Sequence, residues 1–103
     1  MDALEELEAR VAQHPAGRYP VQHATASFHL GALLVDAGRA DEAAAALARS
    51  AELFGRAGLR EERAKALNAL GAALRVAARE DEAAAAFREA ASAFAGLGLT
   101  PEE

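Results

Sequence analysis

The six residues DEAAAA occur twice in this chain, at positions 41–46 and again at 81–86, forty residues apart. Sliding the sequence by forty residues also aligns large and special residues: Leu30 with Leu70, Gly31 with Gly71, Leu34 with Leu74, and Phe54 with Phe94. Alanine runs alone would match at many offsets, whereas these Leu, Gly and Phe matches select this one. A repeat period of about 20–50 residues indicates a stacked repeat architecture.

The composition favours helices throughout the repeat. Ala makes up 31 of the 103 residues, and Ala is the best helix former. No alternating run of β-branched residues predicts a strand. Each unit contains two amphipathic segments separated by glycine or polar residues, so we predict an all-α fold of about five helices. We place it in a single domain over residues 1–103, in four parts. These are an N-terminal half-repeat or cap helix at 2–13, repeat 1 at 20–58, repeat 2 at 60–98, and the start of a further helix or a tail at 100–103.

The segments LGALLVDAGRADEAAAAL and LGAALRVAAREDEAAAAF share a motif of spaced small and large residues. Leu-Gly lies in the middle of the first helix of each unit, and a small residue early in the second helix precedes a large apolar residue by four positions. Over residues 20–99 this pattern resembles the tetratricopeptide repeat (TPR) family. The resemblance implies a right-handed stack of antiparallel helix hairpins, a TPR-like α-solenoid.

Two features depart from the family pattern. The period is forty residues, not the usual ~34, which resembles the longer TPR variants of bacterial regulators and signalling adaptors. The aromatic residue that the family has early in the first helix is Ser27 in one unit and Leu67 in the other.

The chain offers little for catalysis or cofactor binding. It has no Cys, and its three histidines, His14, His23 and His29, lack the four-residue spacing of a zinc-binding helix. Its serines have no paired base nearby in the sequence, and no glycine-rich phosphate loop is present. We therefore predict a protein that is not an enzyme and that has no cofactor and no metal site.

Charge and hydropathy limit the partners further. The net charge is −5, with acids and bases interleaved, so no basic stripe suits a nucleic acid. The start lacks the features of a signal peptide, and no apolar run approaches the ~20 residues of a membrane span. We expect a cytoplasmic protein that binds neither nucleic acid nor membrane.

One face of the first helix of each unit is a candidate partner-binding surface. In the second unit it lies opposite Leu67, Leu70 and Leu74, within an arc of about 80°. Its members are Thr25, Phe28, Ala32 and Val35 in repeat 1, and Lys65, Asn68, Ala72 and Arg75 in repeat 2. The TPR resemblance implies that this arc lines a concave groove for an extended peptide or a partner helix.

We therefore predict a non-catalytic protein–protein interaction module that binds a peptide or helix segment of a partner protein. A segment with an acidic or C-terminal carboxylate end would suit the basic residues of this face. The alternative for Lys65 is an ordinary surface pair with Glu61, one turn earlier.

The end of the second repeat suggests a different function. Phe94, Leu97 and Leu99 form an apolar end, and Thr100-Pro101-Glu102-Glu103 has the features of a helix start. We expect either a second copy to cover this end, which would make the chain a homo-oligomer, or the chain to be a sensor or regulatory fragment of a larger protein.

Overall fold

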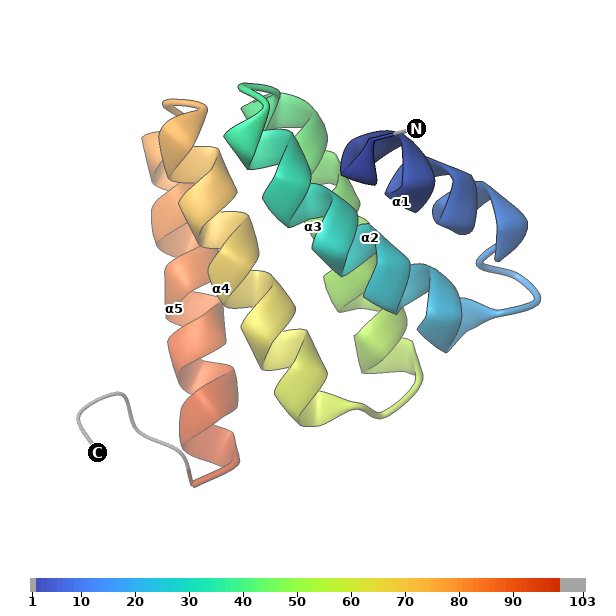
Figure 1. Ribbon diagram of the computed structural model, residues 1–103. Helices are drawn as coiled ribbons and strands as arrows, with labels where there is room; N and C mark the ends of the chain where they lie inside the picture. Colours follow the sequence, from blue (N-terminus) through green and yellow to red (C-terminus); the bar gives the residue numbers. More distant parts are fainter. Residues whose placement is uncertain (1, 99–103) are drawn as a thin grey trace.

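The computed structural model describes residues 2–98, which form five helices and no strand (Figure 1). The helices are α1 (Ala3–Gln13), α2 (Pro20–Asp36), α3 (Ala40–Arg56), α4 (Arg60–Val76) and α5 (Glu80–Gly96). The all-α prediction with about five helices is confirmed over this range. Leu99 and the segment 100–103, where a self-association contact and a helix start were predicted, lie outside the described residues.

The period of forty residues follows from the lengths of the helices. Each of α2, α3, α4 and α5 has 17 residues, and three residues link each to the next. A helix and its link therefore make a unit of twenty residues, and two such units form one hairpin. The repeated DEAAAA opens the second helix of each hairpin.

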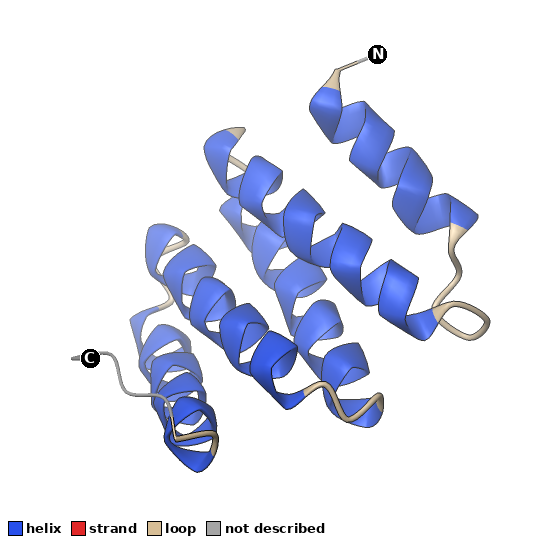
Figure 2. Cartoon of the chain, turned by 60° about the horizontal axis from the view of Figure 1, so that its bottom comes forward, coloured by secondary structure: helices blue, strands red, loops and turns tan. Residues whose placement is uncertain are grey.

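The helices pack in chain order, and α3 contacts both α2 and α4. In Figure 1, α2 and α4 lie in front of the fainter α3, and Figure 2 shows the same order from below. The backbones of α2 and α4 also contact each other directly, whereas within residues 2–98 those of α3 and α5 do not. The stack therefore curves toward the α2–α4 side, which is its concave side.

Two glycines let the helices of each hairpin approach closely. A Cβ atom on Gly31 would lie 2.5 Å from Cγ of Leu47, and one on Gly71 would lie 2.8 Å from Cδ1 of Phe87. Both glycines therefore mark a close crossing of the two helices of their hairpin. A mid-helix glycine costs about 1 kcal/mol relative to alanine, and here the packing of a large side chain against the bare backbone offsets that cost.

Helices α2, α3 and α4 end in the same hydrogen-bonded turn. After α2, the Arg39 amide donates to the Leu34 carbonyl at 2.8 Å and the Gly38 amide donates to the Val35 carbonyl at 3.0 Å. This Schellman arrangement needs a left-handed residue, which is commonly glycine. Gly38 and Gly58 fill that place with φ of 78° and 75°, but after α4 it is Ala78, with φ of 62°.

Ala78→Gly is therefore expected to raise the free energy of unfolding, by about 1 kcal/mol or less. The left-handed conformation costs a residue with a Cβ about 1–2 kcal/mol, while the greater freedom of glycine in the unfolded chain removes part of the gain. Urea unfolding measures the difference. Gly38→Ala is the matched control and should lower the stability, because a Cβ there meets no atom within 4 Å and changes only the backbone strain. The same shift in both variants would contradict the assignment.

Candidate functional site

An open cavity of about 260 Å³ lies between α2 and α4 on the concave side. Its lining comes from three helices: Thr25, Phe28 and His29 of α2, Phe54 of α3, and Glu62 and Lys65 of α4. Thr25, Phe28 and Lys65 belong to the predicted partner-binding set, so the fold brings these three together. His29, Phe54 and Glu62 were not predicted. The helix periodicity that selected Phe28 and Lys65 did not select His29 and Glu62. It also gives no sign that Phe54 of α3 reaches a cavity between α2 and α4.

Two phenylalanines make the apolar part of the cavity. Phe54 is only 4% exposed and belongs to the core between α3 and α4. Phe28 is half-buried and packs against both core clusters, and the His29 ring stands edge-on to it at 5.7 Å between centroids. Because both rings are held by core packing, the apolar surface of the cavity is preformed.

The polar part of the lining carries both signs of charge. Lys65 Nζ lies 3.2 Å from Oε2 of Glu61, so the pairing considered as the alternative for Lys65 is present. Both side chains are more than half exposed, and such a pair is weak and screened by salt. The ammonium group can therefore exchange Glu61 for a partner's carboxylate. Glu62 adds an acceptor to the cavity, which the sequence prediction of a basic surface did not include.

The other predicted partner-binding residues lie outside this lining. Ala32, Asn68 and Ala72 are exposed along the same helices, and Val35 is half-buried against the core. Arg75 is exposed, but its guanidinium carbon lies 5.4 Å from the ring centroid of Phe87 in α5. Stacking of this kind is a cation–π contact, and it directs Arg75 toward α5.

The two predicted self-association residues within the described range are half-buried. Phe94 packs against the core cluster that contains Ala90 and Leu67. Leu97 follows directly after α5 as its C-cap residue. Part of the Phe94 side chain thus serves the core of its own hairpin.

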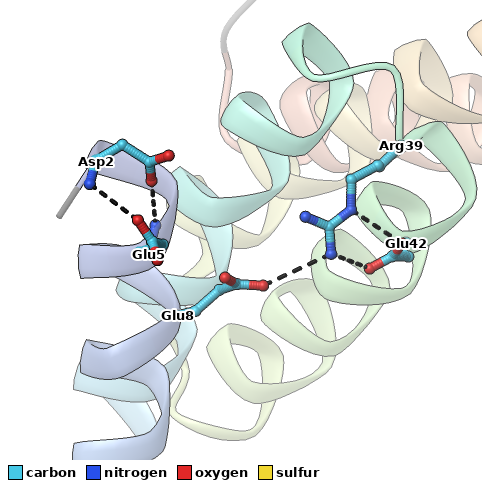
Figure 3. Close-up of polar contacts among 5 residues, drawn as sticks. All are labelled: Asp2, Glu5, Glu8, Arg39 and Glu42. Atoms are coloured by element: carbon cyan, nitrogen blue, oxygen red, sulfur yellow. Dashed lines mark hydrogen bonds and ion pairs between the residues drawn. The ribbon is translucent and has the colours of Figure 1, made fainter.

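Arginines at two helix starts form ion-paired junctions away from the cavity. Arg39 donates to Glu42 through Nε at 3.0 Å and Nη2 at 2.6 Å, and its Nη2 also lies 3.6 Å from Oε2 of Glu8 (Figure 3). Arg79, forty residues later in the sequence, makes the equivalent contacts. It donates to Glu82 at 2.9 and 2.7 Å and to Oδ1 of Asp41 at 3.1 Å.

These hydrogen bonds lower the pKa of the Glu42 and Glu82 carboxyls, because each arginine stabilises the ionised form. Their contribution to stability is present above the ordinary glutamate pKa and is lost as the pH falls through the lowered values. The arginines also link each helix start to another helix, through Glu8 of α1 and Asp41 of α3.

A second cleft, of about 310 Å³, separates α1 from α2. Its lining includes Leu7, Arg10 and His14 of α1 and Gln22, Thr25 and His29 of α2. No residue of α1 is buried, so α1 covers α2 incompletely. Thr25 and His29 border both this cleft and the cavity between α2 and α4.

The part of the chain that the structure describes contains no group of three His, Asp or Glu residues placed to hold a metal ion. In the same part, no helix combines the length and the apolar character needed to cross a membrane. Comparison with protein-family models, with curated proteins and with solved structures found no match for this chain.

Proposed function

We propose that this chain is a TPR-like protein–protein interaction module, a right-handed hairpin stack that binds a peptide or helix segment of a partner on its α2–α4 face and catalyses no reaction. The cytoplasmic location expected from the sequence belongs to this proposal. The observation that carries it is the cavity between α2 and α4, which Thr25, Phe28 and Lys65 line together. The helix periodicity and the repeat had selected these three residues as one face.

The lining favours a particular kind of segment. Phe28 and Phe54 offer a preformed apolar surface, on which a large apolar side chain of the partner would be desolvated. Small-ligand and anchor sites commonly combine such apolar walls with a few polar groups that fix the orientation. Lys65 at the edge would pair with an acidic side chain or a C-terminal carboxylate, and His29 and Glu62 would hydrogen-bond the backbone of the segment.

Ala32, Asn68 and Ala72 would extend the contact beyond the cavity. All three are exposed on α2 and α4, and two of them are alanines that leave room for a partner backbone. A segment lying along both helices would then be anchored at Lys65 and Phe28 and would continue over a flatter surface.

A selection from random peptides tests this proposal without knowledge of the natural partner. The probe is a library of random dodecapeptides, made once with free C-terminal carboxylates and once amidated, and presented to the purified chain. We expect enriched peptides to place a large apolar residue beside an acidic residue or a free carboxylate. Enrichment of basic peptides, or of none, would contradict the proposal.

A further inference from the structure

The second helices of the two repeats differ in how much of their surface is covered. In α3, Ala44 and Ala51 are only 3% and 4% exposed. The repeat-equivalent residues of α5, Ala84 and Ala91, are exposed, and Phe94 is half-buried where Phe54 is buried. Within residues 2–98, one side of α5 thus has the small and apolar residues of an interhelical contact, but no helix packs on that side.

The covered counterpart shows what fits on such a side. Ala51 shares a core cluster with Ala66 and Leu67 of α4, and Ala44 shares one with Ala73 of α4. The matching cover for α5 is therefore a helix with the surface of α4. The close packing of α3 against α4 shows that such small apolar faces fit together.

The same chain carries a second helix of this kind, namely α2. Ala26 and Leu30 of α2 are the counterparts of Ala66 and Leu70 of α4. In α2 this side is covered by α1, which buries none of its own residues and leaves the 310 Å³ cleft. α1 thus occupies, with looser packing, the place on α2 that α3 occupies on α4.

The ion pairs also show α1 in the place on α2 that α3 has on α4. Arg79 donates to Asp41, which lies at the start of α3. Its counterpart one repeat earlier, Arg39, reaches instead for Glu8 of α1, at the longer distance of 3.6 Å (Figure 3). The counterpart of Asp41 is Asp81, exposed at the start of α5.

We propose that α5 of one copy displaces α1 of a second copy from α2, so that copies of this chain stack head to tail with the packing that α3 has on α4. Ala84, Phe87, Ala91 and Phe94 form the contact on α5, and Asp81 of the first copy takes the place of Glu8 beside Arg39 of the second. Such a contact joins two different surfaces and leaves one of each exposed, so it produces an open series and not a closed dimer.

α1 controls this assembly by competing for the same surface. Only a copy whose α1 has left α2 can accept α5, so the apparent affinity is the intrinsic affinity reduced by the fraction of open copies. Loosening α1 raises that fraction. Destabilisation at this one place is therefore expected to strengthen association.

Leu7→Gln in the full chain tests the competition. Leu7 is half-buried and packs α1 against the core, so the polar side chain loosens α1 and leaves the two hairpins in place. Sedimentation velocity over a concentration series is expected to show an apparent association constant at least about tenfold above that of the unmodified chain, with several species in series. Adding Ala91→Glu should return the protein to the monomer. Circular dichroism confirms that each variant keeps its helices.

A charge exchange tests the register. In the Leu7→Gln background, Arg39→Asp alone and Asp81→Arg alone should each associate weakly, because like charges would meet at the contact. An equimolar mixture should form an open series in which the two variants alternate. At one contact the carboxylate introduced at position 39 of one variant meets the guanidinium introduced at position 81 of the other, and at the next contact the unchanged Arg39 and Asp81 meet.

Glu8→Gln gives a milder test should Leu7→Gln lose helicity, because it only releases Arg39, and it should raise association by a smaller factor. The proposal is overturned if the folded, loosened variants associate no more than the unmodified chain. It is also overturned if Ala91→Glu leaves the assembly intact, or if the charge-exchanged mixture binds no better than either variant alone.

Discussion

Leu47→Ala is expected to lower the free energy of unfolding by about 2–5 kcal/mol, the usual range for removing a buried leucine. Leu47 is 2% exposed, and its side chain fills the space above the bare backbone of Gly31. Little can collapse into the hole, because the helices on both sides are held by three-residue links. Urea unfolding followed by circular dichroism measures the loss. Val76→Ala is the control, since Val76 is 61% exposed and should change stability by no more than about 0.5 kcal/mol.

The space left by Leu47→Ala is expected to reverse the effect of a second substitution, Gly31→Ala. In the unmodified chain a Cβ on Gly31 would lie 2.5 Å from Leu47, so Gly31→Ala should be destabilising. In the Leu47→Ala background that clash is absent, and the gain in helix propensity of about 1 kcal/mol remains. Gly31→Ala should then be stabilising. An effect of the same sign in both backgrounds would mean that the two residues do not share this contact.

Gly71→Leu is expected to destabilise the second hairpin by about 1–3 kcal/mol or more through overpacking. A Cβ alone would meet the Phe87 ring at 2.8 Å, and the three further carbons of leucine need space that the ring occupies. The propensity gain of a little under 1 kcal/mol is too small to compensate. Thermal unfolding of Gly71→Leu beside Ala85→Leu tests this, since Ala85 is exposed on α5. Equal melting temperatures would contradict the close crossing.

The helices could be predicted from the sequence because each signal was local. The forty-residue match fixed which segments are equivalent, and the glycines at Gly38 and Gly58 marked where helices end. Ala78 shows the limit of such signals, because it takes the left-handed position without being a glycine. Only the repeat indicated an end at that point.

The cavity was predicted only in part. Helix periodicity gives the direction of a side chain from its own axis, which selected Thr25, Phe28 and Lys65. It does not give the separation of α2 and α4, so it could not show that Phe54, a core residue of α3, also borders the cavity. Arg75 was placed on the same face, but its length lets it reach the Phe87 ring of the neighbouring helix.

The ion pairs of Arg39 and Arg79 could likewise be predicted only in part. Their pairs with Glu42 and Glu82 lie three residues apart and follow from helix geometry. The contacts of Arg39 with Glu8 and of Arg79 with Asp41 join segments that are far apart in the sequence. They depend on how the helices stack, which the composition of the segments does not specify.

The most direct test of the proposed function is the affinity of one selected acidic–apolar peptide, measured by isothermal titration calorimetry at low and at high salt. The unmodified chain is compared with Phe28→Ala, Lys65→Glu and the off-site control Val76→Ala. We expect Phe28→Ala to weaken binding at least about tenfold at both salt concentrations, because it removes the apolar anchor. We expect Lys65→Glu to weaken binding and to reduce its salt dependence, and Val76→Ala to leave the affinity unchanged. Equal affinity of all four proteins for the peptide would contradict the assignment of the α2–α4 cavity as the binding site.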